Sequence, residues 1–231
     1  MVGWTAAGPQ FAESPAGEWS TVVLRAAEQR MVLVVEPCRD LSVAAWGQLL
    51  SGLPLTERSR IEALRRWQDR LNSATGWHLL HRLAHQHGAT VHRAADGRPR
   101  ADPPLDLSLS HSGRWTAVAL SRAGRIGIDV EAVRSVTTAL ARRCLSGHEL
   151  AWLDGVEPGT CRGHRFFQLW TAKEAYLKAT GVGLAVDPRD VSIDCANGEP
   201  VLLGEAADSW EFSYASPAAG VCITVCAERT S

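Results

Sequence analysis

Alternating hydrophobic and polar positions in the middle of the chain predict β-strands. In LDLSLS, residues 105–110, three leucines alternate with aspartate and serine, as in a strand with one face in the core. In IGIDVE, residues 126–131, branched apolar side chains share one face, while Asp129 and Glu131 share the other, with Cα atoms about 6.6 Å apart. One predicted strand therefore carries two carboxylates that point the same way.

Longer stretches of the chain predict helices. Helical periodicity covers residues 41–50, 137–154 and 165–180. A long helix is predicted over residues 56–87, in which Gly76 favours a break or kink. Further strands are predicted at residues 31–38, 116–121, 190–194, 200–203, 210–214 and 220–227.

These runs of helices and strands indicate an α+β fold with small antiparallel sheets. Residues 1–30 have no sustained period and are rich in glycine, proline, alanine and serine, which predicts an irregular leader. The body divides into an N-terminal half, residues 31–125, and a C-terminal half, residues 126–231. Because the leader lies outside this predicted body, its deletion is expected to leave activity intact.

Composition narrows the class of protein. Of the 231 residues, 45% are hydrophobic and 21% charged, and the net charge of −1 gives no support to nucleic-acid binding. No segment approaches the roughly 20 apolar residues that a membrane-spanning helix needs. The six cysteines form no C-x-x-C pair, and the N-terminus lacks the pattern of a signal peptide. We therefore expect a cytoplasmic protein that binds neither nucleic acid nor membrane.

The acidic pair in IGIDVE has two interpretations. Asp129 and Glu131 are typical of a solvated strand face. They are also typical of a site for a hard cation, because Mg²⁺ is commonly held by one or two protein carboxylates, with phosphate oxygens and water as the remaining ligands.

The two lysines of the chain, Lys173 and Lys178, both lie in LWTAKEAYLKATGVGL, residues 169–184, and every other residue of the Lys+Arg total is an arginine. On a helix, Glu174 and Lys178 are four positions apart and can form a surface ion pair worth about 0.2–0.5 kcal/mol. Alternatively, a lysine beside a reacting phosphate offers a compact and mobile ammonium that arginine does not reproduce. The placement of the lysines favours the second interpretation.

The sequence LSLSHSG ends a predicted strand with Ser110 and His111. These residues do not form the G-x-S-x-G elbow of a serine hydrolase. A hydroxyl, an imidazole and backbone N–H groups at a strand end can hold phosphate oxygens, although His111 can also simply close a turn.

Four motifs in order resemble those of surfactin-type 4′-phosphopantetheinyl transferases, and the resemblance covers roughly residues 31–227. The motifs are GRP at 97–99, SHSG at 110–113, GIDVE at 127–131, and WTAKEAYLK at 170–178 followed by GVGL. The resemblance implies a pseudo-dimer in one chain, with two similar halves and the active site at the interface between them. It also implies a monomer.

The resemblance further implies an activity. Members of this family transfer the phosphopantetheine arm of coenzyme A to a serine of an apo acyl or peptidyl carrier protein, release 3′,5′-ADP and require Mg²⁺. Asp129, Glu131 and Glu174 would hold the Mg²⁺ against the pyrophosphate. Lys178 would bind the pyrophosphate, and Glu174 would be the base for the carrier serine, directly or through water. Glu174, Lys178 and Asp129 are thus the predicted catalytic residues.

The resemblance assigns coenzyme A contacts to the N-terminal half. Ser110 and His111 would contact its phosphates, and Arg98 and Pro99 would pack near the adenine. The residues that would bind the 3′-phosphate match the family less closely in this sequence. Its candidates are Arg60 and Ser73, with Arg58, Arg66 and Arg70 as rivals.

Two other functions remain open. One is a non-catalytic module with the same fold that binds coenzyme A or a carrier protein, and the other is a Mg²⁺-dependent hydrolase that cleaves pyrophosphate.

The arginine pairs Arg65–Arg66 and Arg142–Arg143 are expected to be solvated, although either could meet an acidic carrier protein through electrostatic steering.

Overall fold

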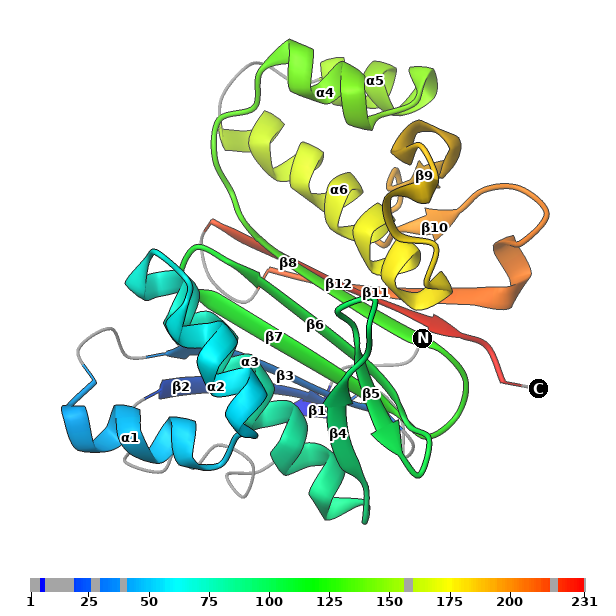
Figure 1. Ribbon diagram of the computed structural model, residues 1–231. Helices are drawn as coiled ribbons and strands as arrows, with labels where there is room; N and C mark the ends of the chain where they lie inside the picture. Colours follow the sequence, from blue (N-terminus) through cyan, green and yellow to red (C-terminus); the bar gives the residue numbers. More distant parts are fainter. Residues whose placement is uncertain are drawn as a thin grey trace. The chain divides into compact units, whose positions relative to one another are not determined.

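The computed structural model shows two compact units, Met1–Ala123 and Gly124–Ser231, each with its own sheet and helices (Figure 1). This division lies beside the boundary expected between residues 125 and 126. The residues that the structure describes are 5–6, 19–25, 30–37, 41–155, 160–216 and 220–230.

The first unit contains a five-stranded antiparallel sheet with the strand order β1-β2-β3-β7-β6. The central strand β3 matches the strand predicted at residues 31–38. The strands are β1 (Thr5–Ala6), β2 (Trp19–Arg25), β3 (Arg30–Pro37), β6 (Asp106–Ser112) and β7 (Trp115–Ser121).

The prediction of an irregular leader over residues 1–30 is wrong for both strands that precede β3. β2 pairs with β3 from Trp19 opposite Pro37 to Leu24 opposite Val32. The ladder with β3 supplies the hydrogen bonds of this segment, and periodicity along the chain does not show such a partner. The rest of the predicted leader, apart from β1 and Arg30, lies outside the described residues.

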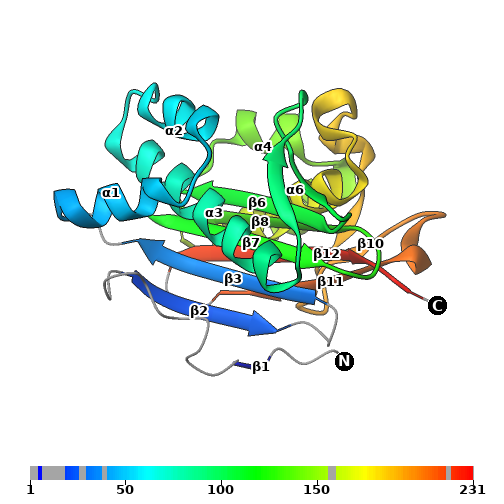
Figure 2. The same cartoon turned by 60° about the horizontal axis from the view of Figure 1, so that its bottom comes forward.

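Three helices, α1 (Val43–Ser51), α2 (Leu55–Glu62) and α3 (Trp67–Gln86), cover one side of this sheet (Figure 2). α3 packs on β7 and β6. Its Trp77, Leu80 and Leu83 enter the hydrophobic core together with residues of the two strands. The core of this unit therefore lies between α3 and the sheet.

The long helix predicted over residues 56–87 is two helices, and the break lies between α2 and α3 rather than at Gly76. A Cβ atom at Gly76 would lie 2.4 Å from Cδ1 of Leu109 on β6. The glycine thus allows α3 to approach the sheet closely, and the helix continues through it. At the break, the Arg70 guanidinium donates to the carbonyl of Leu64.

A hairpin of β4 (Thr90–Arg93) and β5 (Pro99–Asp102) completes the first unit. Gly97 has φ +84° in the connecting turn, which is the turn predicted at residues 95–99. Arg93 of the hairpin forms an ion pair with the buried Glu57 of α2, at 2.8 Å.

β6 is more buried than its alternation predicts. Leu107 is buried as expected, but Ser108 and Ser110 are only 3% and 7% exposed. The polar face of the strand is therefore buried at these two serines, while Asp106 and Ser112 on the same face are half-buried.

The second unit has a three-stranded antiparallel sheet with the order β11-β12-β8. A two-stranded sheet of β9 and β10 lies beside it in the same unit. The strands are β8 (Ile126–Ala132), β9 (Ile193–Asp194), β10 (Val201–Leu202), β11 (Trp210–Ala215) and β12 (Val221–Glu228).

The longest helix of the second unit, α6, lies along β8 and β12, with α4 and α5 beyond it (Figure 1). The helix predicted over residues 137–154 is divided at Leu145, because Ser146 and Glu149 form a capping box that starts a new helix. The helices are α4 (Thr138–Cys144), α5 (Gly147–Asp154) and α6 (Thr160–Thr180), with short 3₁₀ turns η2 (Gly183–Ala185), η3 (Pro188–Asp190) and η4 (Ala207–Ser209).

The predicted α+β class with small antiparallel sheets is confirmed by these elements. The similarity of two halves and an active site at their interface stay predictions. None of the described helices is long and apolar enough to span a membrane.

Candidate functional site

Strand β8 supplies the first two residues of the candidate site. Asp129 and Glu131 alternate with the buried Ile128 and Val130, and lie opposite Thr224 and Cys222 of β12. Asp129 is only 5% exposed. A solvated strand face is therefore the wrong interpretation for this carboxylate.

The close approach of α6 to β8 depends on Gly127. A Cβ atom at this position would lie 1.9 Å from the carbonyl oxygen of Ala175 and 2.6 Å from the amide nitrogen of Ala179. No side chain fits between the strand and the helix backbone at this point. The glycine of GIDVE thus brings the two carboxylates next to the helix that carries Glu174 and Lys178.

Lys178 reaches across from α6 to β8. Its Nζ lies 2.6 Å from Oδ1 of Asp129 and donates to the carbonyl of Ile128 at 3.1 Å. The side chain of Lys178 is 28% exposed and that of Asp129 is 7% exposed. The ammonium therefore has access to solvent while it is held against the strand.

Glu174 faces the same group of charges. Its pKa is raised, first by burial, then by the negative charge of Asp129 and more weakly by that of Glu131, against the opposing charge of Lys178. Glu131 itself forms an ion pair with Arg134 at 3.1 Å. The three predicted carboxylates thus belong to one electrostatic group.

Carboxylate oxygens, which all three residues carry, are ligands that Mg²⁺ accepts in proteins. In the part of the chain that the structure describes, no group of three His, Cys, Asp or Glu side chains is arranged to hold a metal ion. The donors nevertheless fit the ion chemically, since all three are carboxylates, and a bound cation would offset the repulsion that raises the pKa of Glu174. The predicted ligands fit Mg²⁺ in kind but are not preassembled.

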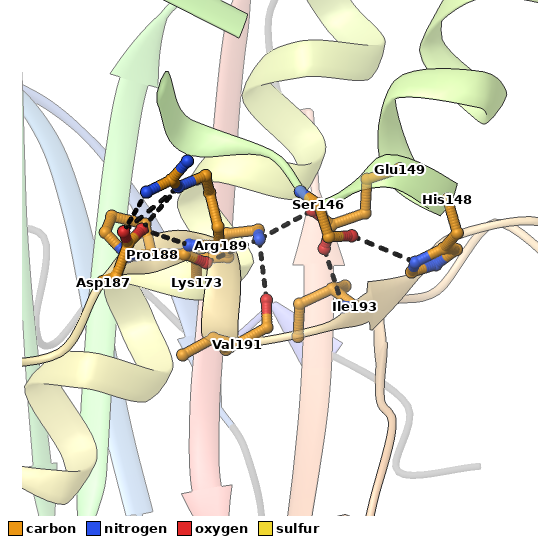
Figure 3. A network of polar contacts seen from close by, with 9 residues as sticks. All are labelled: Ser146, His148, Glu149, Lys173, Asp187, Pro188, Arg189, Val191 and Ile193. Carbon is orange, nitrogen blue, oxygen red and sulfur yellow. Dashed lines mark hydrogen bonds and ion pairs between the residues drawn. The ribbon is translucent and has the colours of Figure 1, made fainter. Parts of the chain in front are cut away.

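The second lysine, Lys173, has a structural environment that the sequence did not reveal (Figure 3). Its side chain is fully buried, and its Nζ lies 2.7 Å from Oε2 of the equally buried Glu149. The same ammonium donates to the carbonyls of Pro188 and Val191, at 2.8 and 2.7 Å. Glu149 also accepts hydrogen bonds from the backbone N–H groups of Ser146, which caps α5, and of Ile193 in β9.

This buried pair ties together α5, α6 and the segment that leads from η3 to β9. Burial lowers the pKa of Lys173, and the hydrogen bond and charge of Glu149 oppose that effect. The capping-box spacing of Ser146 and Glu149 was the one available signal in the sequence, and it does not point to a lysine in another helix. Of the two lysines, Lys173 supports the fold and Lys178 belongs to the candidate site.

The predicted coenzyme A residues lie in the first unit. Ser110 and His111 are neighbours on β6, with Ser110 buried and His111 exposed. Arg98 and Pro99 are half-buried at the start of β5, and the backbone N–H of Arg98 donates to Asp96. Their positions do not test contact with coenzyme A, so the roles assigned to these four residues stay predictions.

The structure separates some candidates for the 3′-phosphate. Arg58 donates to the carbonyls of Leu53 and Ser51, and Arg70 donates to that of Leu64, so both guanidiniums hold backbone carbonyls of their own region. The other candidates have different surroundings. Arg60 is exposed on α2, Ser73 is half-buried on α3, and Arg66 is the exposed residue that precedes α3.

Comparison with known proteins finds a similarity in the second unit. Residues 125–226, which contain all four residues of the candidate site, match the family model described as the 4′-phosphopantetheinyl transferase superfamily. This segment of the chain is therefore similar to that superfamily. Curated 4′-phosphopantetheinyl transferases align with parts of this chain at 30% or 32% identity.

The chain is 32% identical to the 4′-phosphopantetheinyl transferase gsp of Aneurinibacillus migulanus, over 46% of this chain and 44% of that protein. It is 30% identical to psf-1 of Bacillus pumilus, over 60% of this chain and 62% of that protein. It is 32% identical to Sfp of Bacillus subtilis (strain 168), over 36% of this chain and 37% of that protein. The chain thus spans less than two thirds of these phosphopantetheinyl transferases.

Among solved structures, the holo-[acyl-carrier-protein] synthase of Thermotoga maritima aligns with a TM-score of 0.40 and 24% identity. The alignment covers 47% of this chain and 65% of that chain.

Proposed function

We propose that the protein transfers the 4′-phosphopantetheine arm of coenzyme A to a serine of an apo acyl or peptidyl carrier protein. The observation that carries this proposal is the group formed by Asp129, Glu174 and Lys178, where β8 and α6 are in backbone contact within the segment that matches the superfamily. A carboxyl group with a raised pKa can accept a proton, and an ammonium beside it can offset charge on a phosphate, so the group suits phosphoryl-type transfer.

The reaction joins the serine oxygen to the β-phosphorus of coenzyme A. The bond from this phosphorus to the bridging oxygen breaks, and 3′,5′-ADP leaves with the electron pair. Glu174 accepts the serine proton, directly or through water, and its raised pKa suits a general base. Lys178 stabilises the charge that develops on the leaving phosphate.

Asp129, Glu131 and Glu174 are the proposed ligands of Mg²⁺, which when bound would neutralise the pyrophosphate and polarise its phosphorus. Because Asp129 is paired with Lys178, its carboxylate would be shared between the ammonium and the ion. Coenzyme A contacts are assigned to Arg98, Pro99, Ser110 and His111 as part of the same proposal. We further propose that the protein acts as a cytoplasmic monomer.

Intact-mass spectrometry tests the proposed function. An apo carrier protein is incubated with the enzyme, coenzyme A and Mg²⁺, with an EDTA control. We expect a mass increase of one phosphopantetheine arm per carrier and no increase with EDTA.

Two other outcomes contradict this function. Release of 3′,5′-ADP without carrier labelling would indicate a hydrolase, because water would then be the acceptor. Binding of coenzyme A by the folded protein without labelling of any acyl or peptidyl carrier would indicate a non-catalytic binding module.

A further inference from the structure

A guanidinium in the first unit joins the β4–β5 hairpin to helix α2. Arg93 of β4 donates two hydrogen bonds to the carboxylate of Glu57 on α2, from Nε to Oε1 at 2.8 Å and from Nη2 to Oε2 at 2.9 Å. The side chain of Glu57 is only 4% exposed, and that of Arg93 is 24% exposed. Paired hydrogen bonds of this kind fix the orientation of both groups as well as their distance. The hairpin is therefore attached to α2 in a defined geometry.

The third nitrogen of the same guanidinium holds the turn of the hairpin. Nη1 of Arg93 donates to the carbonyl oxygen of Gly97 at 2.9 Å. Backbone hydrogen bonds also close this turn, from the N–H of Gly97 to the carbonyl of Ala94 and from the N–H of Ala94 to the carbonyl of Arg98, both at 2.9 Å. The conformation of the turn is thus fixed relative to Arg93.

The indole ring of Trp77 on α3 supports the guanidinium from a third element. Cζ of Arg93 lies 4.3 Å from the ring centroid, and Trp77 is 1% exposed. An arginine that stacks on an aromatic face is attracted to it and loses freedom to move. Strand β4 itself packs against α3 (Figure 1). The position of Arg93 is therefore determined by α2, α3 and the hairpin turn together.

These contacts indicate that Arg93 positions other groups and does not bind a phosphate itself. Each of its three guanidinium nitrogens already donates to Glu57 or to Gly97. Its positive charge is balanced by the buried carboxylate of Glu57. A guanidinium in this state offers little net attraction to an anion, because the attraction and the repulsion from the paired carboxylate oppose each other.

The two ends of this network carry residues that the sequence assigns to the nucleotide part of coenzyme A. Arg98 and Pro99, the predicted adenine contacts, follow the carbonyl that Arg93 holds. Arg60, a candidate for the 3′-phosphate, is exposed on α2 three residues after Glu57. Adenine and the 3′-phosphate are attached to one ribose, so the groups that bind them must keep a fixed separation. A bridge between the hairpin and α2 sets this separation.

We propose that Glu57 and Arg93 are positioning residues for the nucleotide of coenzyme A, and that this pair holds the hairpin turn and α2 so that both contact the nucleotide at once. This inference rests on the proposed function. Neither residue touches the nucleotide or takes part in the transfer. A site that is preformed loses less conformational entropy when its ligand binds. The pair therefore contributes to coenzyme A affinity and not to the chemical step.

Isothermal titration calorimetry with 3′,5′-ADP tests the nucleotide site by itself. This product contains the adenine, the ribose and the 3′-phosphate of coenzyme A but lacks the pantetheine arm, and its binding is measured without metal. We expect Arg93→Gln and Glu57→Gln each to weaken the binding about tenfold, because the turn then loses its attachment to α2. Unchanged affinity in both folded variants would overturn the proposal.

Glu57→Gln also separates positioning from direct phosphate binding by the sign of its effect. If Arg93 bound a phosphate, loss of the opposing carboxylate would strengthen the binding of 3′,5′-ADP. Positioning requires weaker binding instead. The double variant Glu57→Gln/Arg93→Gln should bind about as weakly as each single variant, since the two side chains act as one unit. Stronger binding by Glu57→Gln, or fully additive losses in the double variant, would overturn the proposal.

A third variant keeps the test valid if removal of one charge prevents folding. Arg93→Lys leaves a positive charge beside the buried Glu57 but lacks the planar fork that joins Glu57 to Gly97. We expect this variant to fold, as circular dichroism and thermal melting would show, and to bind 3′,5′-ADP several-fold more weakly than wild type. Wild-type affinity of Arg93→Lys would show that the attachment of the turn does not matter.

Two control variants distinguish positioning from a general loss of stability or charge. Ser121→Ala removes another side-chain hydrogen bond to a backbone carbonyl of the first unit, from a serine that is 1% exposed to Ala123 at 2.8 Å. Arg122→Gln removes one exposed positive charge. Both controls should bind 3′,5′-ADP as tightly as wild type. A loss in either control equal to that in Arg93→Gln would overturn the proposal.

Carrier labelling separates failure of this inference from failure of the proposed function. In Arg93→Lys the KM for coenzyme A should rise several-fold, while kcat and the carrier KM stay within about twofold of wild type, because only binding of the nucleotide is affected. An unchanged KM for coenzyme A overturns the inference and leaves the transferase function intact. Weaker binding of 3′,5′-ADP by the variants, without labelling of any carrier by wild type, supports the inference and contradicts the transferase function.

Discussion

At the scale of single residues, the two lysines on α6 have opposite surroundings. Lys173 is fully buried, and its ammonium is surrounded by Glu149 and two backbone carbonyls. Lys178 is partly exposed and pairs with Asp129 beside Glu174. A side chain with a compact ammonium suits both positions, since arginine is larger and has a planar group. Only the second lysine is placed to act on a ligand.

Replacement of Glu174 tests its role as general base. Glu174→Gln keeps the shape of the side chain but cannot accept the serine proton, so we expect kcat to fall by at least about a hundredfold. The carrier-labelling rate gives this number, and circular dichroism shows whether the variant folds. The exposed Glu205→Gln is the control and should keep the wild-type rate. Retention of most activity in Glu174→Gln would remove Glu174 from the proposed mechanism.

The identity of Lys178 is testable with its charge preserved. Lys178→Arg keeps a positive charge, but its planar group is larger than the compact ammonium that contacts both Asp129 and the carbonyl of Ile128. We expect a loss of about tenfold or more in kcat/KM for coenzyme A, equivalent to at least about 1.4 kcal/mol of transition-state stabilisation. Wild-type kinetics would show that a positive charge alone is sufficient at this position.

At the scale of elements, the candidate site depends on how closely α6 packs against β8. Gly127 permits this contact, and Gly76 permits the similar approach of α3 to the sheet of the first unit. In both cases the glycine has no special backbone dihedral in the structure and is needed for space. The position of Lys178 against Asp129 is a consequence of the first contact.

Gly127→Ala is expected to separate α6 from β8. The added methyl group would meet backbone atoms, which cannot rotate away as a side chain can, and we expect destabilisation of about 1–3 kcal/mol or more. Chemical denaturation measures this change. Gly147→Ala is the matched control, because nothing lies within 4 Å of its added Cβ and alanine favours the helix. Equal stability of both variants would contradict the role given to Gly127.

The buried pair of Lys173 and Glu149 is testable in the same way. Lys173→Met leaves Glu149 as a buried charge without its ammonium, and we expect the free energy of unfolding to fall by about 3–5 kcal/mol. The double variant Glu149→Gln/Lys173→Met should lose less than the sum of the single changes, as in other coupled pairs. Strict additivity in denaturation experiments would show that the two side chains stabilise the unit independently.

At the scale of the whole molecule, the first unit includes a part of the chain that the sequence pattern assigns to an irregular leader. β2 lies between β1 and β3 in the five-stranded sheet. Its removal would leave the edge of β3 unpaired, so the expectation that residues 1–30 can be deleted without effect does not agree with the sheet topology. Backbone groups of a sheet edge that lose their partners make the strand prone to new pairing.

Deletion of residues 1–29 is therefore expected to lower the thermal midpoint and to increase aggregation. A shorter deletion of residues 1–18 keeps β2 and should have a much smaller effect. Differential scanning fluorimetry and light scattering compare the two. Equal midpoints for the longer deletion and the full chain would mean that β2 adds little to the stability of the sheet.

The sequence by itself determined the order of most elements and the common face of two carboxylates on β8. The period of a strand is two, so the shared face of Asp129 and Glu131 followed from IGIDVE alone. The turn at Gly97 and the strand β3 were predictable for similar local reasons. Local sequence is sufficient where a property depends on the repeat of one element.

Only the tertiary structure decided the features that depend on two segments far apart in the chain. These are the inclusion of β2, the continuity of α3 through Gly76, and the pairing of Lys173 with Glu149. The contact of Lys178 with Asp129 belongs to the same class. Each of these features results from packing or hydrogen bonding with a distant partner. Periodicity along one segment does not identify that partner, because the pattern shows which side of an element is buried and not what covers it.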